Sequence, residues 1–445
     1  MVSWRADRWM PAPRVQTFVS CGILSVDLMG LPVPVPAVDR WLMSRLLEAF
    51  EPLSFPLILN GHEYRPARPE TVSAAVKIRD RWTMAGLLLD PEVAFGDGYS
   101  EGRIEVDGDL VGLLEAVLRT MRDRGTRNWF SRTLSRWLDL WQANTRSGSL
   151  RNIHKHYDLG TDFFQLWLDR QLLYTCAYFP APSLTLEEAQ EAKMDYVCRK
   201  LQLQRGETVV EAGCGWGALA IHMARHYGVR VRAFNISHEQ IVFARRRAAE
   251  EGLDSQVEFI EEDYRNISGP CDVFVSVGMV EHVGASHYRE LGNVIYRAIG
   301  RSGRGLLHFI GRNRHAALSS WIRKVIFPGA YPPPLHEAME IVEPYDYAVL
   351  DVENLRLHYA RTLEFWLERF ERSQDQVAAM FDPQFARAWR LYLAGSLAAF
   401  RVGTLQLFQM VFAGPDSRFH PWTRAHLYTG QREPEQRSTW ISAMP

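Results

Sequence analysis

The sequence predicts an α/β protein, with a doubly wound and mostly parallel sheet that follows a smaller N-terminal α+β domain. Two observations support this prediction. After residue 205, short β-branched runs alternate with helical patterns, which is typical of a parallel sheet with helices on both faces. In addition, the residues V-V-E-A-G-C-G-W-G at 209–217 place three glycines between one such strand and the next helix. In folds of this kind the ligand site lies at the carboxyl ends of the strands.

The composition is that of a globular chain with material for two or three domains. Its 445 residues are 47% hydrophobic, and the formal net charge of −1 argues against a general nucleic-acid binder. Five cysteines without a C-x-x-C pair indicate reduced thiols in a cytoplasm, and no metal site is expected. The apolar stretch at 18–31 is interrupted by Asp27, so neither a transmembrane helix nor a signal peptide is expected.

The N-terminal part, residues 1–118, is expected to form the small domain. Residues 56–59 and 71–78 are strand-like, and residues 110–118 have a helical pattern. Residues 119–150 then predict a basic amphipathic helical linker, because residues 119–155 hold nine Lys or Arg against two acids, with aromatics at helical spacing. Such a segment is suited to an anionic lipid surface, but a linker helix packed on a neighbouring domain explains it equally well.

The remaining residues, 151–445, are expected to form the larger domain. Strands are expected at 208–211, 229–234, 257–260, 272–277, 305–310 and 404–412. Helices are expected at 216–227, 238–250, 355–372 and 385–400. Because the last two helices separate the final strand from the others, we expect them to be insertions that cover the site.

The glycine-rich turn indicates a nucleotide-like ligand. Gly213, Gly215 and Gly217 let the backbone turn sharply and approach a ligand closely. Glu211, at the strand end, can hold a polar or cationic group beside the following helix N-terminus. The G-x-G-x-G spacing differs from the dinucleotide G-x-G-x-x-G and favours S-adenosylmethionine over NAD. A plain turn in another doubly wound domain would also fit.

Further motifs decide the interpretation. They are H-Y-D-L-G at 156–160, Y-T-C-A-Y-F at 174–179, V-G-M-V-E-H-V-G at 277–284, L-L-H-F-I-G at 306–311 and H-Y-A-R-T-L at 358–363. With these and E-A-G-C-G-W-G, the chain resembles the cyclopropane-fatty-acyl-phospholipid synthase family, which includes mycolic acid cyclopropane synthases and fatty-acyl C-methyltransferases, over residues 149–412. The segment A-F-G-D-G-Y-S-E-G-R at 94–103 resembles the extra domain of longer members, so residues 1–118 are expected to be lipid-binding-like.

The resemblance implies a seven-stranded methyltransferase sheet and a defined reaction. A methylene from S-adenosylmethionine is added to a cis double bond of an unsaturated phospholipid acyl chain, and a cyclopropane fatty acid forms. The family uses a bicarbonate ion as the base that removes the proton, and its ligands map onto Cys176, Glu281, His308, Ile310 and Tyr359. Taken singly, Cys176 and His308 would be core residues and Glu281 an acid in a first helical turn. Taken together they favour an anion site.

The same resemblance assigns the cofactor contacts to Tyr157, Asp158, Gly213, Gly215, Asn235, Gln240, Tyr264 and Arg265. There are three departures from the family pattern, of which Phe408, where tryptophan is commoner, is expected to be neutral packing. Asn235 stands where threonine is usual, which weakens the expectation for ribose contacts. Val280 replaces the phenylalanine of F-E-H-V-G and would remove an aromatic ring from a pocket that holds a cation, which would favour a product without ring closure.

The resemblance also implies a cytoplasmic enzyme, peripheral at the inner membrane face, and an association into homodimers. Two other functions stay open. One is a sibling fatty-acyl C-methyltransferase that makes a methyl- or methylene-branched chain without closing a ring. The other is a non-catalytic lipid-binding protein, and the retained Glu281, His308 and Tyr359 argue against it, because a protein without chemistry has no need of a buried acid and its partners.

Overall fold

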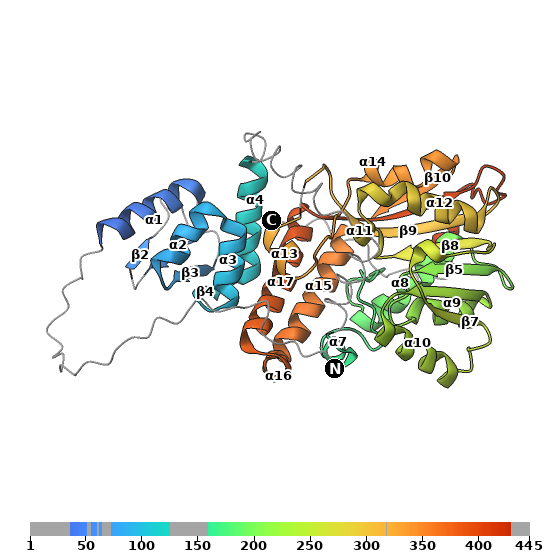
Figure 1. Ribbon diagram of the computed structural model, residues 1–445, viewed down its shortest axis with the longest axis horizontal. Coiled ribbons are helices and arrows are strands. Elements are labelled where there is room, and N and C mark those ends of the chain that lie inside the picture. The colour runs from blue at the N-terminus through green and yellow to red at the C-terminus, as the bar shows by residue number, and fades with distance from the viewer. Residues whose placement is uncertain are drawn as a thin grey trace.

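The computed structural model describes residues 36–50, 55–59, 62–64, 73–124, 159–316 and 318–428. Figure 1 shows a small N-terminal domain beside a larger one, with long helices between them. The expected site residues Tyr157 and Asp158, and most of the basic segment at 119–155, lie outside the described residues. No helix in the described part of the chain combines the length and the hydropathy needed to cross a bilayer.

The N-terminal domain is a four-stranded sheet, in the order β2-β1-β3-β4, with helices packed against it. Its elements are α1 (Ala37–Phe50), β1 (Leu57–Leu59), β2 (His62–Tyr64), β3 (Ala74–Ile78), α2 (Arg81–Leu89), α3 (Pro91–Ser100), β4 (Ile104–Gly108) and α4 (Leu110–Arg124). Along β3, buried and half-buried residues alternate, as in a strand with one face on a core. Helix α2 begins where the Asp80 side chain accepts a hydrogen bond from the backbone N–H of Thr83, at 2.8 Å.

The larger domain contains a seven-stranded sheet, in the order β10-β11-β9-β8-β5-β6-β7. The strands are β5 (Thr208–Ala212), β6 (Arg230–Asn235), β7 (Val257–Glu261), β8 (Val273–Val277), β9 (Arg304–Gly311), β10 (Ala348–Asn354) and β11 (Gln406–Ala413). Strands β5 to β9 are parallel, and β11 runs antiparallel between β9 and β10. The strand order reverses between β5 and β8, and a ligand is expected beyond the carboxyl ends at such a point.

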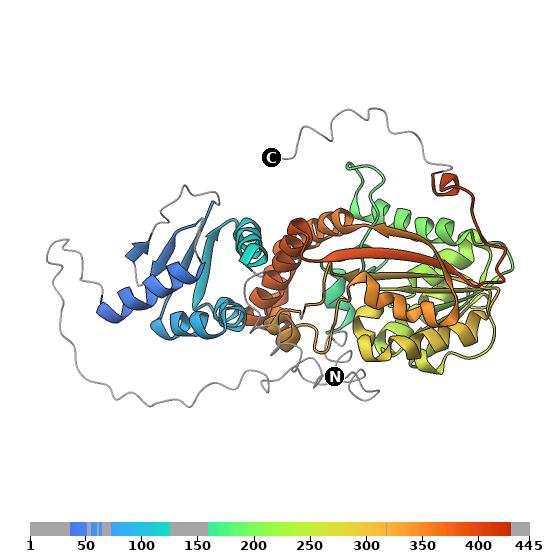
Figure 2. The same ribbon diagram turned by 90° about the horizontal axis from the view of Figure 1, so that it is seen from above.

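Helices cover both faces of this sheet, as Figure 2 shows from above. The longer helices of this domain are α8 (Leu186–Leu201), α9 (Ala218–Tyr227), α10 (His238–Glu250), α12 (Tyr288–Ile299), α15 (Arg356–Arg372) and α17 (Pro383–Val402). The shorter ones are α7 (Thr161–Gln165), α11 (Val280–Val283), α13 (Ser320–Val325), α14 (Leu335–Ala338) and α16 (Gln374–Met380). One apolar cluster joins α8, α9 and α10 to one face of the sheet, and another joins α12 to the other face. The predicted α/β fold is therefore confirmed.

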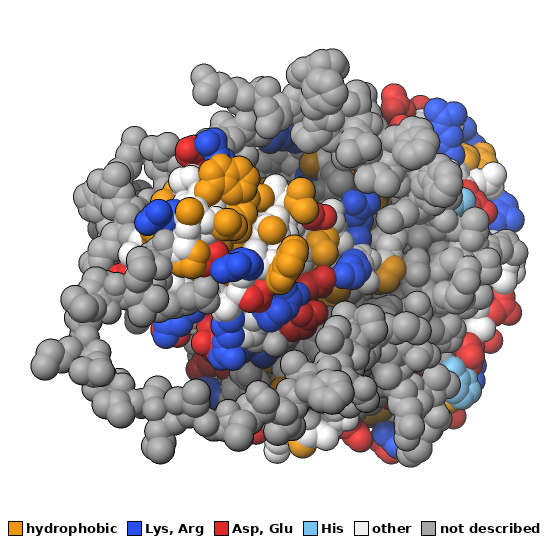
Figure 3. All heavy atoms as spheres, turned by 60° about the vertical axis from the view of Figure 1, so that its left-hand side comes forward, with side chains coloured by type: hydrophobic (Ala, Val, Ile, Leu, Met, Phe, Trp, Pro, Cys, Tyr) orange, Lys and Arg blue, Asp and Glu red, His pale blue; other side chains and the backbone are white. Residues whose placement is uncertain are grey.

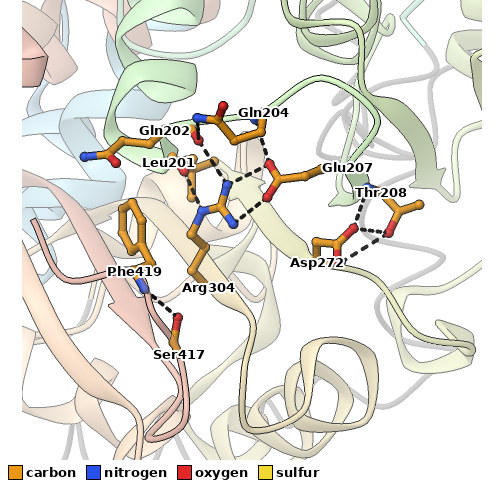
Figure 4. A network of polar contacts seen from close by, with 9 residues as sticks. All are labelled: Leu201, Gln202, Gln204, Glu207, Thr208, Asp272, Arg304, Ser417 and Phe419. Carbon is orange, nitrogen blue, oxygen red and sulfur yellow. Dashed lines mark hydrogen bonds and ion pairs between the residues drawn. The ribbon is translucent and has the colours of Figure 1, made fainter.

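A polar network closes the edge of the sheet at the amino ends of its strands, opposite the expected site (Figure 4). The Arg304 guanidinium, at the start of β9, donates to both carboxylate oxygens of Glu207 at 2.9 and 2.7 Å and to the carbonyl of Leu201 at 2.5 Å. Beside it, the Asp272 carboxylate accepts from the backbone N–H and hydroxyl of Thr208. These bonds hold the starts of β5, β8 and β9 in fixed register.

Helix α17 is the element that joins the two domains. It packs against α15 of the larger domain and against α3 and α4 of the N-terminal domain. The Arg387 guanidinium donates to the backbone carbonyls of Tyr99 and Ile104 at 2.6 and 3.0 Å, and Arg390 donates to the Tyr99 hydroxyl at 2.6 Å. Hydrogen bonds from charged donors are stronger than those between neutral groups, so these contacts stabilise the packing of the N-terminal domain on α17.

The structure also corrects details of the predicted elements. Strand β10 was not predicted, because it is an edge strand in which no residue is fully buried and no apolar run stands out. The helix expected from residue 216 begins at Ala218, since Gly217 adopts a φ of 83° and belongs to the turn. The strand expected at 71–78 begins at Ala74, and residues 71 and 72 lie outside the described part of the chain.

Candidate functional site

The glycine turn leaves β5 at its carboxyl end and enters α9. Gly215 and Gly217 have φ values of 54° and 83°, which other residues rarely adopt. A Cβ on Gly217 would lie 2.5 Å from the Phe259 ring, so glycine is required for the turn to pack against β7. A Cβ on Gly215 would meet no atom within 4 Å, so this part of the turn faces open space that a ligand can fill.

Two buried titratable side chains, one acidic and one basic, lie behind this turn. Glu211 is 2% exposed, and its Oε2 atom has no hydrogen-bond partner among the described residues. Burial raises the pKa of the Glu211 carboxyl to about 8, while the nearby charge of Lys193 acts in the opposite direction. Burial likewise lowers the pKa of Lys193 to about 8, and its Nζ donates to the Thr175 hydroxyl at 2.9 Å. An unpartnered buried carboxylate oxygen suits a ligand that carries a positive charge or polar donors.

Asn235 and Gln240 continue the site at the end of β6 and the start of α10. The Asn235 side chain donates to the Gly215 carbonyl at 3.3 Å and to Gln240 Oε1 at 2.7 Å. The Gln240 Nε2 atom is buried and has no partner among the described residues. A buried donor without an acceptor, beside an open glycine turn, fits a ligand with hydroxyl or ring-nitrogen acceptors.

Tyr264 and Arg265 lie in a short 3-10 helix after β7, η1 (Tyr264–Asn266). The Arg265 guanidinium is paired with Asp263 at 3.0 Å and with Glu290 at 3.1 Å, and it lies over the Tyr264 ring at 4.8 Å. The Arg265 charge is thus already balanced by two acids. The side chain stabilises the loop that carries Tyr264.

The five residues expected to hold an anion are brought together in one cavity of about 510 Å³. They come from four separate parts of the chain, with His308 and Ile310 both on β9, and all five line the cavity: Cys176, Glu281, His308, Ile310 and Tyr359. Glu281 belongs to α11, and its Oε1 atom accepts a hydrogen bond from the Ile310 N–H at 2.6 Å. Glu281 Oε2 and His308 Nε2 are buried and have no partner among the described residues.

The protonation of this pair is set by burial. Burial raises the pKa of the Glu281 carboxyl to about 7 and lowers the pKa of His308 well below its ordinary value, so the ring is neutral. The Gln409 amide nitrogen lies 3.0 Å from His308 Nδ1, so Nδ1 accepts and the ring proton is on Nε2. A donor at His308 and an acceptor at Glu281 therefore line the same cavity, and together they suit a protonated oxyanion.

The other members of the cavity are held in place by packing. Cys176 is 1% exposed, its thiol donates to the Ala177 carbonyl at 3.1 Å, and burial raises its pKa. The Tyr359 ring packs on Phe400, with centroids 4.5 Å apart. Gln190 of α8 donates to the Thr175 carbonyl at 2.9 Å and so fixes the segment before Cys176.

The glycine turn and the cavity are neighbours along the sheet edge. A Cβ on Gly213 would lie 3.3 Å from Met279, which directly precedes α11 and the Glu281 carboxyl. The Gly278 N–H donates to the His308 carbonyl at 2.8 Å, which ties the end of β8 to β9. A ligand in the turn and an anion near Glu281 would therefore lie on either side of the end of β8.

Two expectations need revision. Val280 is fully buried in the apolar cluster with α12, and it is not among the residues that line the cavity, so its exchange removes no aromatic face there. The sequence interpretation also missed Lys193, Thr175 and Gln409 as supporting residues. Two features of the sequence could have indicated Lys193 and Gln409: a lysine on the apolar face of a helix and a glutamine inside a mostly apolar strand. No such feature indicates Thr175.

Comparison with known proteins gives a consistent result. The sequence model of the family described as mycolic acid cyclopropane synthetase matches residues 142–410. A probable fatty acid methyltransferase of Pseudomonas putida is 33% identical over 406 residues, which cover 87% of this chain and all of that protein. The cyclopropane-fatty-acyl-phospholipid synthase of Escherichia coli K12 is 35% identical over 345 residues, which cover 76% of this chain and 88% of that protein.

Among solved structures, the chain is similar to a mycolic acid cyclopropane synthase, CmaA1, complexed with SAH and CTAB. The TM-score is 0.57 at 30% sequence identity, and the match covers 59% of this chain and 97% of that chain. Almost the whole of that chain is therefore matched by little more than half of this one.

Proposed function

Because the chain belongs to the mycolic acid cyclopropane synthetase family of S-adenosylmethionine-dependent methyltransferases, we propose that it converts a cis double bond of a phospholipid acyl chain into a cyclopropane. One observation carries the proposal. An apolar cavity contains a buried acid and a buried neutral imidazole, each with one atom that lacks a partner among the described residues. An alkene substrate needs such a combination of a dry channel and a proton acceptor.

The residues at the glycine turn fit S-adenosylmethionine. The unpartnered Glu211 Oε2 and Gln240 Nε2 atoms and the open space at Gly215 would hold its charged and polar groups. When bound, the cofactor supplies an electrophilic methyl group. Since an alkene is a weak nucleophile, the main task of the protein is to align the double bond and to keep water away. Apolar lining residues such as Phe327, Leu363 and Leu391 do both.

Ring closure requires that the added carbon loses a proton while the second carbon–carbon bond forms. We propose that Glu281 and His308, with Cys176, Ile310 and Tyr359, hold a bicarbonate ion, which would supply the base. In this arrangement His308 Nε2 donates to the ion and the ionised Glu281 carboxylate accepts its hydroxyl proton. The carboxylate then receives the proton that the base has collected, and its pKa of about 7 suits that transfer.

A fatty-acyl C-methyltransferase without ring closure is the second candidate. It is favoured by the similarity to the Pseudomonas putida protein, which spans 87% of this chain. Incubation with S-adenosylmethionine and unsaturated phospholipid vesicles, followed by proton NMR of the lipids, separates the two. High-field ring protons would support the cyclopropane, and olefinic methylene protons or a branched methyl signal would refute it. Absence of S-adenosylhomocysteine release would refute both.

We also propose that the enzyme meets its lipid at a membrane surface through the outer faces of α1 and α2. Trp82 and Leu89 lie two turns apart on α2 and are 81% and 88% exposed, and Trp41 of α1 is 57% exposed. Figure 3 shows hydrophobic side chains beside Lys and Arg side chains on this end of the molecule. Tryptophan next to arginine is the composition of surfaces that rest in a lipid interface.

A further inference from the structure

We propose that the N-terminal domain holds the methyl-terminal part of the acyl chain and thereby selects substrates by the number of carbons beyond the double bond. This inference rests on the proposed function and assigns a specificity-determining role to residues outside the methyltransferase sheet. The supporting observation is the extent of the cavity, which continues from the Glu281 and His308 end into the interior of the other domain.

The far end of the cavity is built from the core of the N-terminal domain. Leu57, Val76, Ile78 and Leu113 line it, and each is less than 7% exposed and belongs to the apolar cluster of that domain. A close-packed core has few voids larger than a water molecule, because every void forfeits contacts. A cavity that reaches into this core is therefore suited to an apolar ligand, and its volume of about 510 Å³ is within the range of ligand sites.

Small residues of α17 form the passage between the two ends. Gly395, Ser396 and Ala399 all line the cavity where α17 passes between the domains. A Cβ on Gly395 would meet no neighbouring atom within 4 Å, so the glycine leaves open space in the middle of a 20-residue helix. Glycine is less favourable than alanine in a helix interior, so helix stability does not account for a glycine at this position.

The chemistry of the lining sets the direction of the chain. The residues that the N-terminal sheet contributes, such as Leu57 and Val76, offer nothing that could bond to an ester or a phosphate. Arg312 and Arg314, which also line the cavity, follow β9 on the side of His308. Arg122 of α4 lines the cavity as well, but its guanidinium already donates to the Val402 carbonyl at 3.1 Å. An anionic headgroup is favoured near arginines, and a methyl terminus is favoured in an apolar core. The carbons beyond the double bond therefore enter the N-terminal domain.

The comparisons agree with a separate role for this domain. The family match spans residues 142–410, and the mycolic acid cyclopropane synthase of known structure covers 59% of this chain. The reaction of that enzyme therefore needs no counterpart of the N-terminal domain. The N-terminal domain therefore has a role other than the chemical step, and its apolar cavity is suited to selecting acyl chains by their length beyond the double bond.

The test uses Gly395→Leu, which narrows the passage, and Met380→Leu as a matched control at a 45% exposed position on α16. Purified full-length proteins receive vesicles with equal amounts of palmitoleoyl, cis-vaccenoyl and oleoyl chains. Oleoyl has two more carbons beyond the double bond than the other two, whereas cis-vaccenoyl has two more on the ester side. The burial of two methylenes corresponds to about a tenfold change in relative turnover.

We expect Gly395→Leu to lower oleoyl turnover about tenfold relative to palmitoleoyl, with the ratio of cis-vaccenoyl to palmitoleoyl unchanged and the control like the wild type. Unchanged ratios, or a change in the cis-vaccenoyl ratio instead, would overturn the inference. So would an equal loss of all three chains at an unchanged melting temperature. If Gly395→Leu does not fold, Ala399→Leu, one turn further along α17, replaces it.

Binding of cis-parinaric acid, followed by its fluorescence, gives a readout that does not need turnover. Gly395→Leu should weaken this binding about tenfold and Met380→Leu should leave it unchanged, while equal affinity for all three proteins would refute the inference. A wild-type protein that binds the probe but forms no product would refute the proposed function, and with it the length selection of substrates, while weaker probe binding by Gly395→Leu would still support an acyl chain in this cavity.

Discussion

The replacement Glu281→Gln tests the proton-accepting role most directly. The Gln side chain has the same shape, and its carbonyl oxygen can still accept the 2.6 Å hydrogen bond from the Ile310 N–H, so the cavity should keep its geometry. The other oxygen, which lacks a partner among the described residues, becomes an amide that donates and cannot accept a proton. Loss of a positioned acid or base typically costs about 10²–10⁴ in rate, and we expect a loss in this range.

The wild-type pH profile should report the same group. With a pKa of about 7 for the Glu281 carboxyl, kcat/KM should be about tenfold higher at pH 8 than at pH 6, since only the ionised form accepts a proton. The residual activity of Glu281→Gln should lack this rise. The assay is release of S-adenosylhomocysteine with unsaturated phospholipid vesicles, and calorimetric binding of S-adenosylhomocysteine should remain within about threefold of the wild type.

Stability provides the control for misfolding. The folded-state pKa of Glu281 is raised above its ordinary value of 4.5, so the folded protein binds the proton more tightly and loses stability as pH rises from about 4.5 through 7. Glu281→Gln avoids that loss and should be up to about 3 kcal/mol more stable at pH 8 in chemical denaturation. Turnover close to the wild type, or a pH profile shared by both proteins, would refute the assigned role.

Three further predictions concern other parts of the molecule. Lys193→Met should weaken S-adenosylhomocysteine binding about tenfold at pH 7 and less at pH 9, because at pH 9 Glu211 is ionised even without the nearby charge of Lys193. A calorimetric affinity of the variant that does not depend on pH would contradict this. Gly217→Ala should lower the free energy of unfolding by about 1–3 kcal/mol, because its φ is 83° and its Cβ would collide with a ring, and an unshifted denaturation midpoint would show otherwise. Trp82→Ala should weaken cosedimentation with anionic vesicles several-fold, whereas Trp422→Ala, at a fully exposed position on the other domain, should not; equal binding would argue against the proposed membrane face.

The strands and helices around the glycine turn were predictable because their signals are local. Strand β8 is a run of five buried residues, four of them apolar, and the helix expected at 238–250 is α10 with the same bounds. Strand β10 was not predictable in this way. Its five central residues are all half-buried, with no alternation of buried and exposed positions, and only its pairing with β11 at the edge of the sheet makes it a strand.

The amino-acid order determined the family and the alternation of strands and helices, and it supplied the residue types of both sites, because motifs and periodicity are written in neighbouring positions. Only the tertiary structure decided which groups are deprived of water. Burial gives Glu281 and Glu211 their raised pKa values, places Val280 in the core, and turns His308 into a neutral donor through Gln409 of another strand. The course of the cavity past Gly395 into a second domain is likewise a property of packing. Solvation and cavity shape depend on segments far apart in the chain, and no local pattern contains them.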